Sequence, residues 1–360
     1  MGKIIKTFNS SSLLVPFVSI LLGLLTGAVF MLAGGYNPIA AYGSLINRIF
    51  SSPYNMGETI RAITPLIFTG IAVAFAFRTG LFNIGVEGQF MMGMTGATLV
   101  GVLADLPWFI HAPLAVITGA VFGGVWAAIA GYLKAARGVN EVISAIMLNW
   151  IALFLSNFLI VRFVVVEGQQ KSKPIRESAM VKMDWLVQAL DSARMHWGTV
   201  VALVCVVIFY LILWRTKLGY ELRAVGLSPE AAHYAGMNVK RTMVKSMFIS
   251  GLFAGLGGVF EMLGVFGYQT VMAATWGYGF DGIAVALLGG NTPVGVFLGA
   301  VLFGGLNYGS AGMSFGADVP PEVVRIVIGA IIFFVASHGI VKWMLKPFLM
   351  KRANNRKEAA

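Results

Sequence analysis

Ten apolar segments run through this chain of 360 residues, and most are as long as a lipid bilayer is thick. A helix needs about 20 apolar residues to cross the hydrocarbon core. Inside that core every backbone N–H and C=O group must find a partner within the protein, which favours α-helices. The sequence therefore predicts an all-α, polytopic transmembrane helical bundle with about ten spans, near residues 12–33, 60–78, 88–104, 112–133, 142–165, 197–214, 244–265, 280–291, 293–312 and 322–345.

Composition agrees with lipid as the main solvent. Only 11% of the residues are charged and 58% are hydrophobic, whereas an ordinary soluble domain carries about 25% charged residues. We attribute the net charge of +11 to membrane topology, and we expect membrane lipid and no nucleic acid as a partner. One cysteine, Cys205, and four scattered histidines predict neither a disulfide nor a metal site.

The positions of Lys and Arg predict the orientation. If the N-terminus is cytoplasmic and ten spans follow, most of the 26 basic residues fall on the inner side. We therefore expect both termini to be cytoplasmic, with a transmembrane domain over 1–345 and a basic cytoplasmic tail over 346–360. The outer loop 166–196 weakens this bias because it also carries Lys and Arg. Its residues 180–190 have helical apolar spacing, which predicts a short helix that lies either on the membrane interface or in water.

Two patterns concern how the spans pack. Segment 280–291 is too short for a perpendicular crossing, which predicts a broken or re-entrant element. A faint likeness between 80–85 and 279–283, in opposite orientations, indicates either inverted repeats or chance. Pairs of glycines four residues apart allow close helix contact; they are Gly23/Gly27, Gly119/Gly123, Gly251/Gly255, Gly295/Gly299 and Gly305/Gly309.

Several polar residues at or near membrane depth are candidates for the translocation path. Asn83, Glu87 and Gln89 stand among glycines, which loosen a helix and free backbone polar groups. They belong either to a broken segment lining the path or to a turn just outside the bilayer. Asn149 lies two turns inside a span, and Asp281 lies in the short segment. A carboxylate at such a depth is costly unless it is paired or hydrated. Asn140 we interpret as a helix cap.

The predicted inner loop 215–245 contains signals for a two-turn helix over 229–235. Ser228 is a favourable N-cap, Pro229 suits the first helical position, and Glu230 suits the positive end of the helix dipole. Gly236 is a favourable C-terminal stop. So short a helix needs a surface to pack on. It is either a plain connector or a docking helix for a cytoplasmic partner.

These residues carry a family resemblance that covers roughly 12–345. The inner loop resembles the coupling loop of ABC-importer permeases in the ribose and branched-chain amino-acid superfamily. The run 81–89, with Asn140-Glu141, 146–149 and 279–289, resembles the branch associated with nucleosides, the purine-nucleoside lipoprotein-dependent importers. The resemblance implies a role in ATPase coupling for Gly219, Leu222, Arg223, Gly226, Pro229, Glu230, Ala231, Ala232 and Gly236.

The resemblance also implies partners and a location. The partners are a second homologous permease or a second copy, a cytoplasmic ATPase and an extracytoplasmic substrate-binding lipoprotein, and the location is the bacterial cytoplasmic (inner) membrane. The phosphate-binding pattern G-x-x-x-x-G-K-[ST] is absent. We therefore expect no cofactor in this chain, with ATP and Mg²⁺ bound by the ATPase, and no enzyme activity.

The leading functional hypothesis is a nucleoside permease. The aromatic residues Trp276, Tyr278 and Phe280 either stack on the base of the nucleoside or lie at the lipid interface. A permease for simple sugars or riboflavin is the alternative within the class. A proton-coupled secondary transporter using Glu87, Glu141, Glu261 or Asp281 is the alternative from another class.

Overall fold

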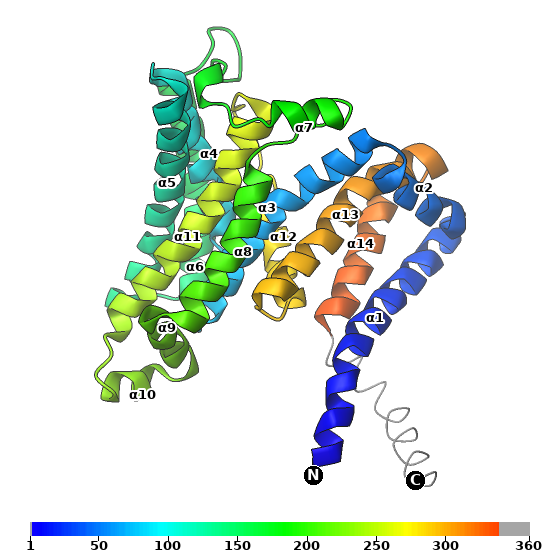
Figure 1. Ribbon diagram of the computed structural model, residues 1–360, viewed down its shortest axis with the longest axis horizontal. Coiled ribbons are helices and arrows are strands. Elements are labelled where there is room, and N and C mark those ends of the chain that lie inside the picture. The colour runs from blue at the N-terminus through cyan, green and yellow to red at the C-terminus, as the bar shows by residue number, and fades with distance from the viewer. Residues whose placement is uncertain (1, 338–360) are drawn as a thin grey trace. The chain divides into compact units, whose positions relative to one another are not determined.

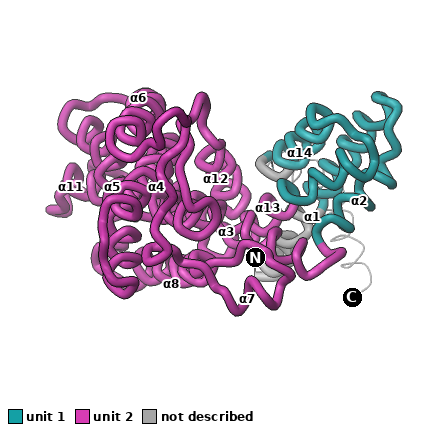
Figure 2. The backbone as a smooth tube through the Cα atoms, turned by 90° about the horizontal axis from the view of Figure 1, so that it is seen from above, with its two compact units in different colours: residues 1–49, 306–360 teal, residues 50–305 magenta. Residues whose placement is uncertain are grey.

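The computed structural model describes residues 2–337, which are mostly α-helical (Figure 1). Within that range three isolated bridges are the only β-type pairings, so the predicted all-α class is confirmed. The chain divides into two compact units, residues 1–49 with 306–360 and residues 50–305 (Figure 2). The predicted tail 346–360 and the end of the segment 322–345 lie outside the described residues.

The first unit is built from the two ends of the chain. It contains α1 (Gly2–Ala33), most of α2 (Pro38–Phe50), the end of α13 (Pro293–Ala317) and α14 (Pro321–Ala336). Gly23 and Gly27 of α1 face Ile331 and Val327 of α14, where a Cβ atom would have no room. The glycine pair of the first span therefore serves close helix packing, as predicted.

The second unit holds the long helices that surround the candidate site, which run beside one another in Figure 1. The pairs Gly119/Gly123 of α5 and Gly251/Gly255 of α11 lie against each other, so that the two backbones are in contact. Two of the predicted glycine pairs thus meet in one interface. The long helices that lie wholly in this unit are α3 (Pro53–Phe77), α4 (Val86–Leu103), α5 (Trp108–Arg137), α6 (Glu141–Phe163), α8 (Gly198–Arg215) and α11 (Val239–Glu261).

Two interruptions break this bundle. Residues 78–85 separate α3 from α4. The second interruption follows α11, which continues through a π-helical turn, η2 (Met262–Phe266), and stops at Gly267 with φ of 69°. After an irregular stretch, α12 (Tyr278–Leu288) has 11 residues, about 16 Å at 1.5 Å per residue. That is about half of a 30 Å hydrocarbon core, and it confirms that the eighth segment is short.

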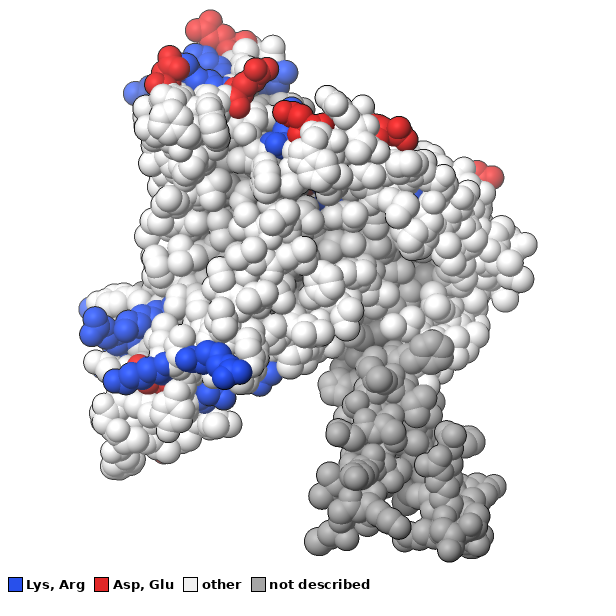
Figure 3. All heavy atoms as spheres, in the orientation of Figure 1, with Lys and Arg blue, Asp and Glu red and all other residues white. Residues whose placement is uncertain are grey.

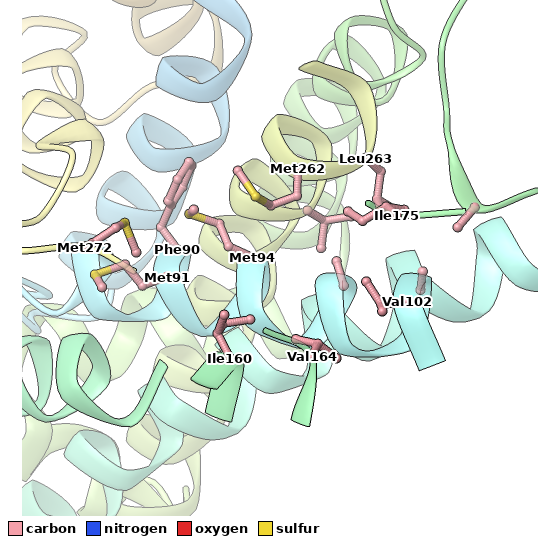
Figure 4. Packing of buried hydrophobic residues seen from close by; sticks show 14 of the residues in the cluster. Phe90, Met91, Met94, Val102, Ile160, Val164, Ile175, Met262, Leu263 and Met272 are labelled. Atoms are coloured by element: carbon pink, nitrogen blue, oxygen red, sulfur yellow. The ribbon is translucent and has the colours of Figure 1, made fainter. Parts of the chain in front are cut away.

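The loop 166–196 is a folded part of the second unit. It contains η1 (Glu177–Ala179) and α7 (Asp184–Ala189), so a short helix does form in the predicted stretch. Backbone N–H groups of the loop bond the end of α11: Ile175 N donates to Gly267 O at 2.8 Å and Val181 N to Leu263 O at 3.1 Å. Ile175 also enters the buried cluster around Met262 and Leu263 (Figure 4). The loop therefore covers this end of the helices as part of the core.

Each of the ten predicted apolar segments coincides with a helix over most of its described residues. Six described helices are long and apolar enough to cross a membrane by themselves, which is roughly consistent with ten spans once the short and partly described helices are added. The sequence reading did not predict α2 or α9 (Lys217–Leu227). Helix α10 (Pro229–Tyr234) matches the predicted two-turn helix.

Candidate translocation and coupling site

The N-terminal ends of α4 and α12 meet at Glu87. The Glu87 carboxylate accepts backbone hydrogen bonds from Gly277 N at 2.7 Å and Gly279 N at 2.6 Å. Glu87 is fully buried, and Gly279 lies so close to its backbone that no larger residue fits there. Since the carboxylate sits near the positive ends of two helix dipoles, it holds the N-terminal ends of α4 and α12 together.

Asn83 and Gln89 form a closed amide pair just before this point. Asn83 Nδ2 donates to Gln89 Oε1 at 3.0 Å and Gln89 Nε2 donates to Asn83 Oδ1 at 2.9 Å. Asn83 Nδ2 also donates to Ser250 Oγ at 2.8 Å, and Ser250 Oγ donates to Ala72 O at 2.6 Å. The pair thus joins the break 78–85 to α11 and α3.

Asn149 of α6 clamps the same break from the other side. Its Oδ1 accepts from Gly88 N at 2.9 Å and its Nδ2 donates to Ile84 O at 3.0 Å. Gly88 N is one of the free N–H groups of the first turn of α4, so Asn149 caps a helix that lacks a side-chain cap of its own.

The structure thus brings four of the five predicted path residues together. Asn83, Glu87, Gln89 and Asn149 are all buried, with 5% exposure or less. Asp281 lies in the first turn of α12 and is partly exposed. In this conformation the four buried side chains hold the two breaks in place, and their role in lining a path stays a prediction.

A charged cluster with two buried carboxylates lies beside this point, and the sequence did not predict it. Glu58 of α3 pairs with Arg61 Nε at 2.8 Å and with Arg194 Nη2 of the loop at 2.6 Å. Arg61 Nη1 reaches Glu261 of α11 at 3.2 Å, and Tyr278 of α12 donates to the same carboxylate at 3.3 Å. One network therefore connects α3, the loop 166–196, α11 and α12. The only sequence signal was Arg61 and Glu261 inside apolar segments.

Two residues of the loop in this region, Arg194 and His196, have shifted pKa values. The hydrogen bond with Glu58 raises the pKa of Arg194 above its usual value. His196 is fully buried close to Arg61, and burial, with the charge of Arg61 as the second cause, lowers its pKa to about 4. His196 Nδ1 accepts from Gly198 N at 3.1 Å, so the neutral ring is the form this site stabilises.

The residues predicted to couple to an ATPase lie on α9, α10 and the turn after them. Ser228 Oγ accepts from Ala231 N at 3.2 Å, and Gly236 ends the turn with φ of 81°, which confirms the predicted cap and stop. Leu222 and Ala232 are buried, Arg223 is partly exposed, and Pro229, Glu230 and Ala231 are exposed. Gly219 lies directly on backbone carbonyls at the end of α8.

Gly226 brings this pair of helices into contact with the first break. A Cβ atom on Gly226 would collide with the carbonyl oxygen of Arg78. Arg78 in turn donates from Nε to Asn291 O at 2.8 Å, in the turn between α12 and α13. Its guanidinium also lies 5.3 Å from the centre of the Trp214 ring of α8. Contacts therefore run from α9 through Arg78 to the residues that follow α12.

Two large side chains of this helix pair are almost fully exposed. Leu227 is 90% exposed and Tyr234 is 92% exposed. These two residues were not predicted, because the helix over 229–235 was inferred from its capping residues alone.

The aromatic and acidic residues considered for other roles have partners within the second unit. The Trp276 ring lies 4.9 Å from that of Phe266, and the Tyr278 ring lies 5.4 Å from that of Phe90, whereas Phe280 is 48% exposed. Glu141 pairs with Lys134 at 2.8 Å.

Comparison with known proteins gives a family match over most of the chain. Residues 55–336 match the family described as branched-chain amino acid transport system / permease component. The chain is 51% identical to the guanosine ABC transporter permease protein NupP of Bacillus subtilis over 96% of its length and 99% of that protein. It is 40% identical to the nucleoside ABC transporter permease protein NupB of Lactococcus lactis, over 94% of each chain. It is 32% identical to the glucose ABC transporter permease protein TsgB13 of Haloferax volcanii, over 91% of this chain and 88% of that protein.

Proposed function

The chain belongs to the family of branched-chain amino acid transport system permease components, and we propose that it forms the translocation path of an ATP-driven nucleoside importer. It is a multi-pass membrane protein and a transport subunit, not an enzyme. The observation that carries the nucleoside assignment is the 51% identity, over nearly the whole chain, to a guanosine permease. The glucose permease at 32% identity favours the sugar alternative less strongly.

The proposed partners follow from this assignment. A cytoplasmic ATPase binds ATP and Mg²⁺ and docks on α10 and the end of α9, where Tyr234 and Leu227 are exposed. A second permease, or a second copy, completes the path, and a substrate-binding lipoprotein delivers the nucleoside from outside. The proposed location is the bacterial inner membrane, with both termini in the cytoplasm and the loop 166–196 outside.

The contacts described above support a coupling mechanism. Movement of the ATPase displaces α9 and α10, and Gly226 transmits the displacement to Arg78 and Thr79 because no side chain lies between the backbones. The break 78–85 continues into Asn83, Gln89 and Glu87, and Glu87 holds the N-terminus of α12. The predicted path residues thus lie at the end of this chain of contacts, where a shift of α4 and α12 would open or close the path.

Uptake by cells tests the substrate. A strain lacking this gene should lose uptake of radiolabelled guanosine and keep uptake of ribose and riboflavin, and the wild-type gene should restore it. Glu230→Arg with Gly236→Val should fail to restore uptake although the chain reaches the membrane. Loss of ribose or riboflavin uptake with guanosine uptake intact would contradict the nucleoside assignment.

A reconstituted system separates the two classes of transporter. In liposomes holding the purified chain alone, a proton gradient should drive no accumulation of guanosine, since the carboxylates considered for proton transfer have structural partners: Glu87 binds backbone N–H groups and Glu261 pairs with Arg61. Accumulation under these conditions would instead support the proton-coupled alternative.

A further inference from the structure

A basic pocket of about 450 Å³ lies where α9, the turn after α10 and the start of α11 meet. Lys217 and Glu221 of α9 line one wall, and Arg241 and Lys245 of α11 line the other. Its volume lies within the range of about 300–1,000 Å³ that is usual for small-molecule sites. The proposed transport function uses none of these four side chains.

The charges of the pocket favour an anion. Three cations, Lys217, Arg241 and Lys245, face one carboxylate, Glu221. The Lys217–Glu221 pair is 4.0 Å long and Lys217 is 90% exposed, so that pair is weak. Within residues 2–337, Arg241 and Lys245 form no ion pair. The N-terminal ends of α9 and α11 add to the positive potential.

A second, shallower depression of about 290 Å³ adjoins this pocket. It is formed by Ala128 of α5 and by Val244, Phe248 and Ile249 of α11, and its exposed surface is apolar. Lys245 lines both depressions. Such a residue can lay its carbon stem along the apolar groove and turn its ammonium group into the polar pocket. The ligand that suits both is an amphiphile with an anionic head and an acyl chain.

We infer that this pair of depressions binds an anionic phospholipid, with the phosphate between Arg241 and Lys245 and an acyl chain along Ala128 and Phe248. Figure 3 shows that Lys and Arg gather on the second unit at the end of α9 and α10, next to a band almost free of charge. In the proposed orientation this end meets the inner leaflet, where basic pockets attract anionic lipids. An acidic segment of a partner protein would satisfy the cations but leave the apolar groove uncovered.

Binding of lipid to the purified full-length chain tests this inference. Native mass spectrometry should show retention of phosphatidylglycerol in preference to phosphatidylcholine with the same acyl chains. Arg241→Gln with Lys245→Gln should raise the Kd for phosphatidylglycerol about 30-fold, given about 1 kcal/mol for each basic residue. The matched variant Arg215→Gln with Lys240→Gln removes two exposed charges that line neither depression, and its Kd should stay at the wild-type value.

The groove has its own test. Ala128→Leu narrows the groove, so it should weaken phosphatidylglycerol binding but not the weak binding of sn-glycerol 3-phosphate, which has no acyl chain. Tight binding of glycerol phosphate by the wild-type chain would assign the pocket to soluble phosphates and overturn the inference.

Equal retention of the two lipids, or equal losses in the two double variants, would also overturn it. So would the absence of lipid binding together with protection of Lys245 from an amine reagent by the ATPase, since the occupant is then a protein. None of these measurements depends on uptake, so a chain that fails to transport guanosine can still bind the lipid.

Discussion

At the scale of single residues, Glu87 is the side chain whose role can be decided most directly. Glu87→Gln replaces a carboxylate that accepts two backbone N–H groups by an amide with one oxygen acceptor. We expect a loss of about 1.5–3 kcal/mol in stability, the usual worth of a hydrogen bond to a charged group. Thermal unfolding of the purified chain in detergent measures this. Glu167→Gln, at an exposed position of the loop, should leave the unfolding midpoint unchanged.

The same variant separates two roles for Glu87. If Glu87→Gln unfolds at the wild-type temperature but has lost guanosine uptake, the carboxylate acts in the path itself and the anchoring role is wrong. If stability and uptake fall together, the anchor explains both.

His196 predicts a dependence of stability on pH. Its pKa is about 4 in the folded chain and about 6.5 in an unfolded one. Above pH 6.5 both states are neutral and the contribution is fully present. As the pH falls from 6.5 towards 4, the unfolded state gains a proton first and stability is lost. His196→Asn keeps an acceptor for Gly198 N, and its unfolding midpoint should change less with pH between 6.5 and 4 than that of the wild-type chain. An equal pH dependence in both chains would mean that another group causes it.

Single residues also show where sequence reasoning stops. Asn83, Glu87, Gln89 and Asn149 could be selected because polar side chains are rare in apolar segments. Their partners could not, because Gly277 lies 190 residues from Glu87 along the chain. The pair Glu58–Arg194 spans 136 residues, and no local pattern signals such a contact.

At the scale of helices, the contact of α9 with the break 78–85 predicts that a glycine-to-alanine change lowers stability where helix propensity alone would raise it. Alanine normally stabilises a helix by about 1 kcal/mol relative to glycine. Gly226→Ala should instead destabilise the chain by about 1–3 kcal/mol, the usual range for overpacking, since its Cβ would meet the Arg78 carbonyl. We expect guanosine uptake to fall while the ATPase remains bound.

The control for Gly226 is another helical glycine. Gly43→Ala in α2 places its Cβ in open space, so stability should stay level or rise. The two variants are compared by thermal unfolding and by uptake in the deletion strain. A stabilised, fully active Gly226→Ala chain would exclude the proposed contact as the coupling route.

Helices differ in how far the sequence predicts them. Helix α10 could be predicted residue by residue because Ser228, Pro229 and Gly236 act locally. The shortness of α12 followed from counting apolar residues. The sequence could not predict that the loop 166–196 packs over the ends of the helices. Its conformation depends on backbone N–H groups that donate to Gly267 and Leu263, which are far away along the chain. Helix α9 was missed because Gly219 and Gly226 read as loop residues, whereas each allows a backbone contact.

At the scale of the whole molecule, the two broken helices and the coupling helices act as one system in residues 50–305. Glu87, Asn149 and the Asn83–Gln89 pair fix the N-terminal end of α4, and Glu87 also holds the N-terminal end of α12. The network of Glu58, Arg61, Arg194 and Glu261 ties the same region to the loop 166–196. A signal from the proposed ATPase and one from the proposed lipoprotein would therefore reach the same place from opposite ends of the second unit.

Signals can arrive from opposite ends only if α10 and the loop 166–196 face opposite sides of the membrane, which labelling can decide. The native Cys205 is buried, so single cysteines at Ala231 and Gln188, both exposed, can be introduced without a background of reaction. A membrane-impermeant maleimide should label Gln188→Cys in intact cells and Ala231→Cys only after permeabilisation. Labelling of both from outside would contradict the topology. The reverse pattern would place α10 outside the cell, beyond reach of any cytoplasmic ATPase.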